Sequence, residues 1–351
     1  MNRKKRILVT FASVPFIRGG AEICVESLCY ELKNRGYLVE MISIPFQWSP
    51  KIEIIKNVMA WRMLNLEKTA GNLVDLLIAT KFPSYAAKHP NKITWLFHQH
   101  RAAYDLFGTV YSDFDRHNPD DETIRDQIIR IDNKMLAESK GIYSIARNTS
   151  ERLKHYNRIK STPLYHPPKL QGKYRCQNYG DYIFSVGRLE NLKRIDLLLK
   201  SLTYSDKRIR CIIAGTGGLE PYLKQLTKEL KLDGRVEFVG YVDDEKLIEL
   251  YANCFAVYFA PFDEDYGYIT LEAFLSKKPV VTCRDSGGVL EFAEHDVNGK
   301  IAEQAEAGLL GEQITELYKD KTYCEYLGNN GFRKVKDINW DDVIKHLTAT
   351  I

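Results

Sequence analysis

The carboxylates best placed to do chemistry in this chain follow one apolar run, within residues 254–274. The run itself, 254–260, is continuously apolar, which is typical of a parallel strand buried on both faces. A turn follows that carries three carboxylates, Asp263, Glu264 and Asp265. After Gly267 an apolar helical pattern runs from about Tyr268 to Ser276. This order predicts a strand, a loop and a helix N-terminus, whose unpaired N–H groups and dipole favour a phosphate.

Two glutamates in this stretch have seven residues between them. Glu264 belongs to the loop, whereas Glu272 lies one turn inside the predicted helix, between apolar neighbours. An unpaired carboxylate there would be costly, so Glu272 needs a hydroxyl or a cation to bond. The spacing predicts that Glu264 lies on the loop side of one cleft and that Glu272 lies on its helix side. An ordinary acidic loop before an amphipathic helix is the alternative explanation.

This Glu-x7-Glu pattern around a Tyr-Gly turn resembles the retaining GT-B glycosyltransferases of family 4. Residues 278–282, the segment 286–288 (Ser-Gly-Gly) and Glu291 continue that family's pattern. The resemblance covers nearly the whole chain and is most specific within 239–299. It implies a nucleotide-sugar donor, an α-linked product, and no essential metal or other cofactor.

Basic residues gather after the first predicted strand of the second half, in residues 185–194. Arg188 follows the strand end and Lys193 precedes a helix, so both could point into one cleft. Without a metal, such cations must neutralise a departing nucleotide diphosphate. The family places its phosphate-binding pair on these two residues. Arg194 stands where Gly is commoner in the family, and a surface charge cluster is the alternative explanation.

Two glycine-rich turns also follow predicted strands. Gly19 and Gly20 open the first helix, and their bare backbone lets N–H groups come close to a ligand. The family uses this loop against the phosphate and sugar of the donor. Gly215 belongs to a turn in which Glu220 replaces the third Gly of a dinucleotide fingerprint, so a dehydrogenase is weakly indicated.

The resemblance assigns the remaining donor contacts. Tyr241 and Val242 would line the base pocket, where Tyr241 can stack on the base. Glu272 would bond the ribose hydroxyls, and Glu264 the hydroxyls of the donor sugar. Backbone amides would help to hold the diphosphate, from Tyr266, Gly267, Tyr268, Ile269 and Thr270.

Two histidines follow a predicted strand of the first half. His98 comes directly after the apolar run 93–97, and His100 is two residues further on. The family carries a functional histidine directly after this strand, which matches His98, with His100 as the rival. Alternate histidines could also bind a metal, but the sequence offers no third ligand. The carboxylates 263–265 also mimic the metal-binding Asp-x-Asp of the other glycosyltransferase fold, although the Glu-x7-Glu pattern explains them better.

Apolar runs alternate with helical patterns along the whole chain, which predicts α/β domains with parallel sheets. The strands are expected at 6–10, 38–44, 74–79, 93–97, 141–145, 182–186, 210–214, 236–239, 255–260 and 280–282. The helices of the first half are expected at 20–35, 52–69, 121–138 and 149–156, and the tail from Gly308 onward reads helical.

A stiff segment rich in proline, 163–168, and a polar stretch, 171–180, mark a domain boundary. The resemblance implies the GT-B architecture, in which two Rossmann-like domains face an interdomain cleft. These would be an acceptor-side domain over 1–170 and a nucleotide-sugar-binding domain over 171–338. A helix within 339–351 would pack back on the first domain.

The composition is that of a soluble globular protein. With 351 residues, 44% apolar and 27% charged, the chain is long enough for two cores. No window reaches the roughly 18 apolar residues of a membrane span. The charged and apolar start resembles a signal peptide, but no small-residue cleavage site follows, so a first strand is predicted. The seven cysteines are scattered singly, which favours a reducing, cytoplasmic location.

The net charge of +4 hides an asymmetry, because residues 1–170 sum to +9 and residues 171–351 to −5. One explanation of this asymmetry is an ordinary solvated surface. The other is a basic N-terminal half that faces an anionic lipid surface or a phosphorylated acceptor. The apolar pattern 52–69, interspersed with cations, predicts a core-facing helix. Its alternative is a membrane-surface role, with peripheral association on the inner face of the plasma membrane.

The resemblance implies a retaining, hexosyltransferase-type enzyme that uses a UDP- or GDP-linked sugar. Its acceptor would be a glycan or a lipid-linked molecule of bacterial-type surface polysaccharide or glycoconjugate synthesis, with no nucleic acid as partner. The acceptor would attack on the face of the leaving group, whose phosphate takes the proton, and the loop 101–119 is expected to meet the acceptor. Two other classes stay open, a nucleotide-sugar epimerase on the same fold and a non-catalytic nucleotide-sugar-binding subunit.

Overall fold

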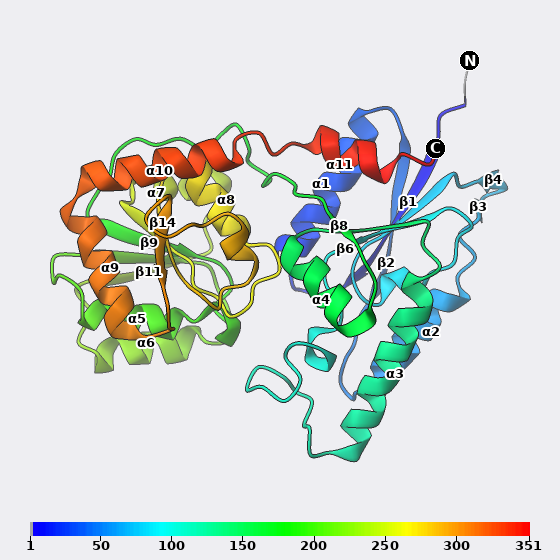
Figure 1. The fold of residues 1–351 in the computed structure, drawn as a ribbon, viewed down its shortest axis with the longest axis horizontal. Coiled ribbons are helices and arrows are strands. Elements are labelled where there is room, and N and C mark those ends of the chain that lie inside the picture. Colours follow the sequence, from blue (N-terminus) through cyan, green and yellow to red (C-terminus); the bar gives the residue numbers. More distant parts are fainter. Residues whose placement is uncertain (1–2) are drawn as a thin grey trace. The chain divides into compact units, whose positions relative to one another are not determined.

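The computed structural model describes residues 3–351, which form two compact α/β units. One unit contains the described chain up to Lys169 together with Asn339–Ile351, and the other contains Leu170–Ile338. In each unit, helices pack against a sheet whose strands all run parallel (Figure 1).

The sheet of the first unit has the strand order β2-β1-β5-β6-β7-β8. Its strands are β1 (Arg6–Ser13), β2 (Leu38–Pro45), β5 (Leu76–Ala79), β6 (Lys92–Leu96), β7 (Gly141–Ser144) and β8 (Thr162–Pro163). Its helices are α1 (Gly20–Asn34), α2 (Ile52–Met63), α3 (Pro119–Leu136), α4 (Arg147–Asn157) and α11 (Trp340–Leu347). The order reverses between β1 and β5, which creates a switch point where open α/β sheets bind ligands.

The prediction of a helix over 52–69 is wrong at the C-terminal end of that range. The helix stops at Met63, and a short antiparallel hairpin follows, formed by β3 (Lys68–Thr69) and β4 (Asn72–Leu73). The turn between these strands consists of Ala70 and Gly71, both with positive φ, of 47° and 79°. Such a two-residue turn matches the twist of a hairpin, and it ends the helical pattern.

The second unit has the strand order β11-β10-β9-β12-β13-β14, the doubly wound arrangement of dinucleotide-binding folds. Its strands are β9 (Tyr182–Val186), β10 (Arg210–Ala214), β11 (Val236–Gly240), β12 (Ala256–Tyr258), β13 (Val280–Cys283) and β14 (Gly299–Ala302). Its helices are α5 (Ile195–Thr203), α6 (Glu220–Glu229), α7 (Asp244–Asn253), α8 (Tyr268–Leu275), α9 (Ala307–Lys319) and α10 (Lys321–Val335). The prediction of two α/β domains with parallel sheets is confirmed, although β8 in the first sheet and β14 in the second were not anticipated.

The end of the chain packs into the first unit through an aromatic cluster. The ring of Trp340, at the start of α11, lies 6.1 Å from the ring of Trp95 and 5.8 Å from that of His166. Arg35 at the end of α1 also pairs with Asp341. The contacts between these rings, together with the ion pair, attach α11 to the first unit.

Helix α2 turns its apolar side toward the core. Ile54, Val58 and Trp61 are buried, while Met59 and Met63 are exposed. Its cations pair with carboxylates, Lys51 with Asp121, Lys56 with Glu53 and Arg62 with Glu138. These ion pairs leave less positive charge for a lipid surface, and the membrane interpretation stays a prediction.

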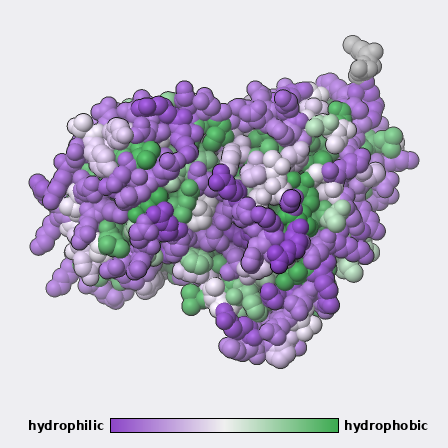
Figure 2. Space-filling view, in the orientation of Figure 1, coloured by the Kyte–Doolittle hydropathy of each residue, from purple (hydrophilic) through white to green (hydrophobic). Residues whose placement is uncertain are grey.

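Purple, hydrophilic residues cover most of the face seen in Figure 2, with apolar residues scattered among them. Within residues 3–351, no helix combines the length and the apolar character that crossing a bilayer requires. All seven cysteines are free thiols, and five of them are buried.

Candidate functional site

The acidic loop predicted from the sequence lies at the carboxyl edge of the second sheet. It leaves β12 beside the end of β9, at the point where the strand order reverses. The Phe262 N–H donates to Leu192 O at 2.9 Å, so the loop is tied to η3 (Asn191–Lys193), the turn that follows β9. The sheet therefore brings the basic and acidic segments of the sequence together.

A second segment holds the acidic loop from the other side. The Asp263 N–H donates to Asp285 O at 2.8 Å, and the Gly288 N–H donates to Glu264 O at 2.7 Å. A Cβ on Gly288 would lie 2.5 Å from Asp265 O, so only glycine allows this approach. This contact gives the Ser-Gly-Gly segment of the family pattern a physical reason.

Lys193 and Glu264, predicted for the diphosphate and the donor sugar, form an ion pair with each other. Their side chains are 19% and 22% exposed, so both remain within reach of a ligand. Arg188 is 46% exposed and donates to Glu190 at 2.8 Å. The predicted pair of cations thus consists of one anchored lysine and one exposed arginine that can turn toward a ligand.

Arg194, the local departure from the family pattern, is buried and cross-links the loops around this edge. Its backbone is left-handed, with φ 48° and ψ 44°, which explains why glycine suits this position. Its guanidinium donates to Ala260 O at 2.7 Å, to Pro261 O at 2.8 Å, and to both carboxylate oxygens of Asp285 at 2.7 Å. Sequence analysis marked the residue as unusual but did not predict this role.

Helix α8 begins at the predicted Tyr-Gly turn. Gly267 precedes it with φ 83°, and a Cβ there would lie 3.3 Å from the side chains of Phe259 and Val289. The hydroxyl of Thr270 is buried and finds no hydrogen-bond partner in the described part of the chain. Tyr266 and Gly267 are buried, whereas Tyr268 and Ile269, the first residues of α8, are partly exposed.

Glu272 lies on the first turns of α8, as the sequence predicted. Its carboxylate accepts a hydrogen bond of 2.7 Å from the hydroxyl of Tyr251, in α7. Desolvation raises the pKa of Glu272 to about 7, although the hydrogen bonds of Tyr251 and Tyr174 act in the opposite direction. The carboxyl group therefore changes its charge near neutral pH, where hydroxyl groups of a ligand could take over the bond from tyrosine.

The glycine-rich turn after β10 packs against the loop after β9. A Cβ on Gly215 would lie 1.9 Å from Gly187 O, and a Cβ on Gly217 would lie 2.4 Å from Leu189 O. Gly215 thus supports the loop that carries Arg188. Tyr241 follows the edge strand β11 with its ring exposed, and the neighbouring Val242 is partly exposed.

In the first unit, Gly19 and Gly20 lie at the start of α1, beside the switch point between β1 and β5. The Gly19 N–H donates to the Glu22 carboxylate at 2.9 Å, which in turn lies 3.2 Å from the ammonium of Lys81. Lys81 is buried, with its ammonium 4.2 Å from the centre of the Phe11 ring. Lys81 was not predicted from the sequence, in which it is a single cation separated from the apolar run 76–79 by Thr80.

The two histidines differ in their surroundings. His98 follows β6 and is half-buried, with Nδ1 2.8 Å from Gln99 O. The ring of His100 packs between three phenylalanines, with centroid distances of 5.4–5.8 Å to Phe46, Phe82 and Phe114. Burial, with a smaller contribution from His98, lowers the pKa of His100 to about 4, so its ring is neutral at pH 7.

Across residues 3–351, no group of three or more His, Cys, Asp or Glu side chains is arranged to hold a metal ion.

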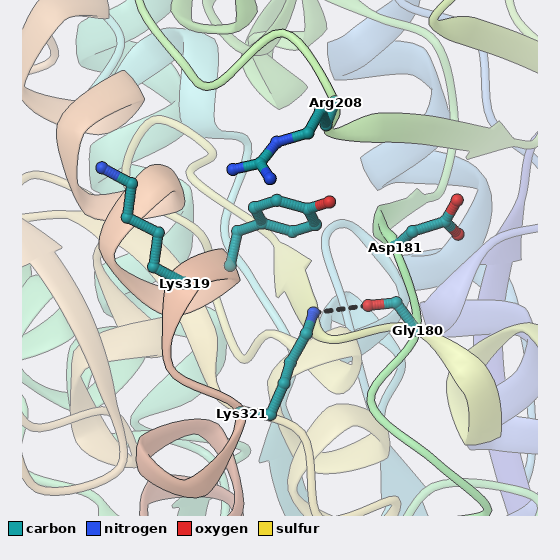
Figure 3. Close-up of a pocket in the computed structure, with 6 residues that line it drawn as sticks. Gly180, Asp181, Arg208, Lys319 and Lys321 are labelled. Atoms are coloured by element: carbon teal, nitrogen blue, oxygen red, sulfur yellow. Dashed lines mark hydrogen bonds between the residues drawn. The ribbon is translucent and has the colours of Figure 1, made fainter.

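A pocket of about 410 Å³ occurs elsewhere in the second unit, near the amino ends of β9 and β10. Figure 3 shows Arg208, Lys319 and Lys321 around it. Arg208 pairs with Asp206, and Lys321 donates to Gly180 O, so these two cations already have partners. The pocket lies at the sheet edge opposite to the predicted site.

Comparisons with known proteins show what this chain is similar to. Residues 169–334 match the family model "Glycosyl transferases group 1". An uncharacterized glycosyltransferase of Methanocaldococcus jannaschii is 25% identical over 379 residues, covering 97% of this chain and 96% of that protein. The sucrose-phosphate synthase of Thermosynechococcus elongatus has a TM-score of 0.79 at 17% identity, over 98% of both chains. Anabaena HepE, solved in complex with UDP and glucose, has a TM-score of 0.70 at 18% identity, over 98% of both chains. The structural likeness shows the GT-B fold, and the family match with these relatives supports a glycosyltransferase.

Proposed function

We propose that this protein is a metal-independent, retaining glycosyltransferase of family 4. It would move a hexose from a UDP- or GDP-linked donor to a glycan or lipid-linked acceptor. One observation carries the proposal: two cations, a glycine-capped helix end and the two glutamates of the Glu-x7-Glu pattern lie on neighbouring loops and a helix at one switch point. The solved complex of Anabaena HepE with UDP and glucose supports a nucleotide-sugar donor.

Each group at this edge has a chemical task in the proposed reaction. Arg188 and Lys193 neutralise the charge that develops on the departing diphosphate, which also takes the proton of the attacking acceptor hydroxyl. The amides at the start of α8 share this charge through the helix dipole. Glu272 accepts hydrogen bonds from the ribose hydroxyls. Glu264 binds the hydroxyls of the sugar once the ligand displaces it from Lys193.

The acceptor side of the proposal rests on the first unit. His98 and the loop of Gly19 and Gly20 are proposed to hold the donor sugar, and the loop 101–119 is proposed to meet the acceptor. A role in surface polysaccharide or glycoconjugate synthesis, in the cytoplasm or on the inner face of the plasma membrane, completes the proposal. The +9 charge sum of residues 1–170 supports an anionic partner for this half.

Nucleotide binding tests the proposed donor site. We expect UDP or GDP to bind the parent protein, and Arg188→Ala and Lys193→Ala each to lose about 1.5–3 kcal/mol of charge-assisted hydrogen bonding. This loss corresponds to an affinity about 10- to 150-fold lower, measured by isothermal titration calorimetry. Arg208→Ala, which removes an exposed cation at the opposite sheet edge, is the matched control and should bind as the parent does. Parental affinity in both site variants would remove these residues from the donor site.

The reaction class is read from the products of a screen over nucleotide sugars and acceptors. A new α-linkage from an α-linked donor, formed in the presence of EDTA, is the expected result. A nucleotide sugar with inverted configuration at one carbon, produced without any acceptor, would identify an epimerase instead. Donor binding without transfer or hydrolysis in the whole screen would identify a non-catalytic binding subunit. A β-linked product would contradict retention.

The raised pKa of Glu272 predicts a pH-dependent donor affinity. Ribose hydroxyls donate to the ionised carboxylate, whose fraction rises as the pH passes its pKa of about 7. Binding of the nucleoside diphosphate should therefore strengthen by up to about tenfold between pH 6 and pH 8. Glu272→Gln retains the shape but not the charge, so it isolates this contribution from the titration of the nucleotide itself. Identical pH profiles for parent and variant would argue against the ribose role.

A further inference from the structure

A buried polar network begins at Gln99, the residue that follows His98 in the chain. The side chain of Gln99 is fully buried, and its amide Nε2 donates to Asn157 Oδ1, at the end of α4. Asn157 Nδ2 in turn lies 2.7 Å from Asn133 Oδ1 and 3.3 Å from the hydroxyl of Tyr104. The residue between the two histidines is thus anchored to helices α3 and α4.

The same network ends at a carboxyl group in the core. The hydroxyl of Tyr104 donates to Asp132 Oδ2 at 2.6 Å, and Asp132 is fully buried. Burial raises the pKa of Asp132 to about 7. A polar chain of this kind is costlier than apolar packing, but it fixes the position of each member because its donors and acceptors have directions. Such a network is suited to holding one segment in a single conformation.

The hydrogen bond of His98 determines where its proton lies. His98 Nδ1 lies 2.8 Å from the backbone oxygen of Gln99. A carbonyl oxygen can only accept, so Nδ1 carries the hydrogen, and in the neutral ring Nε2 is then an acceptor. Because the Gln99 side chain is anchored on Asn157, the peptide that presents this oxygen is held in place.

We propose that Gln99 is a positioning residue that sets the ring orientation and the Nδ1–H tautomer of His98. Its side chain, locked by Asn157, holds the carbonyl that accepts from Nδ1, and the Nε2 lone pair can then accept from a hydroxyl of the donor sugar. This last step rests on the proposed function of His98. The anchoring and the tautomer rest on contacts within the first unit alone.

The tautomer can be measured without any glycosyl transfer. The full-length protein is labelled with ¹⁵N-histidine, and long-range ¹H–¹⁵N spectra at pH 8 report which ring nitrogen carries hydrogen, with His98→Ala to assign the signals. We expect the Nδ1–H form in the parent. Gln99→Leu and Asn157→Ala should each shift His98 toward the Nε2–H form that free imidazole prefers. Asn157→Ala does not alter the sequence of the 98–100 segment. It therefore tests the anchoring of Gln99 even where Gln99→Leu fails to fold.

Ser150→Ala, on the same helix α4 but bonded to Ser161 O instead of Gln99, is the matched control and should keep the Nδ1–H form. Turnover at saturating donor should fall about tenfold in both network variants, with the donor KM changed less than twofold. An Nε2–H form in the parent, or an unchanged tautomer in both network variants, would overturn the proposal. A shifted tautomer together with parental turnover of His98→Ala would instead retain the positioning role and remove His98 from the reaction.

Discussion

Replacing Arg194 by alanine is expected to lower the unfolding free energy of the second unit by about 3 kcal/mol. The guanidinium of Arg194 is buried and makes four hydrogen bonds, two of them to the carboxylate of Asp285. Removing it leaves Ala260 O and Pro261 O without this donor in a desolvated position. For a unit of this size the loss corresponds to a melting temperature about 6–12 °C lower, measured by thermal unfolding of the full chain.

Two further variants separate the causes of this loss. Arg194→Gly removes the same hydrogen bonds but relieves the left-handed backbone, so it should be about 1 kcal/mol more stable than Arg194→Ala. Asp285→Asn keeps the bonds to the two carbonyl groups, and the Asp285 side chain is 42% exposed, so it should cost less than half as much. A melting temperature of Arg194→Ala within about 2 °C of the parent would contradict the cross-linking role.

Arg194 also illustrates what sequence analysis could and could not foresee. The resemblance identified it as an unusual residue, because glycine is commoner in the family at that position. Its left-handed backbone and its three loop contacts depend on tertiary neighbours more than 60 residues away, and no local pattern reports these. By contrast, the resemblance already assigned Lys193 and Glu264 to one donor site, and the parallel strands do bring the loops after them to one edge of the sheet.

The fold was predictable where hydrophobic periodicity was strong and failed where turn geometry decided the structure. Ten strands were expected close to their observed places, since continuous apolar runs of parallel strands stand out in a sequence. The hairpin β3–β4 was missed because Ala70 is a helix former, and its positive φ in the turn is imposed by the neighbouring Gly71 and the strands. The strand β14 was missed because Gly299 and Lys300 interrupt its apolar pattern.

The histidines show the same division at the level of the site. The family pattern singled out His98, but nothing local in the sequence excluded His100, which lies two residues away. The structure adds that Phe46, Phe82 and Phe114, which belong to other segments, pack against the ring of His100. Such packing over long sequence distances cannot be read from a local pattern, so the choice of His98 stays a prediction.

His98→Ala is expected to lower turnover at saturating donor by about two orders of magnitude. In the proposed reaction, positive charge develops near the reacting carbon, and an oriented imidazole lone pair stabilises it while holding the sugar hydroxyls. Alanine can do neither, and water in its place lacks the fixed orientation. The His98 side chain is half-buried at the end of β6, so its removal should cost little stability. Initial rates and a thermal melt of the same preparation separate the two effects.

His100→Ala is the matched control, because it removes an imidazole two residues away. It should change turnover by less than about threefold. It should also lower the stability of the protein, because it leaves an unfilled space among the phenylalanines. The folded pKa of His100, about 4, lies below its unfolded value near 6.5, so His100 costs the parent stability as pH falls through this window. The stability difference between parent and His100→Ala should therefore narrow as the pH is lowered from 7 to 5. A His98 variant with parental turnover beside an inactive His100 variant would reverse the assignment, since it would mean that the enclosed ring, and not the one held by Gln99, reaches the donor sugar.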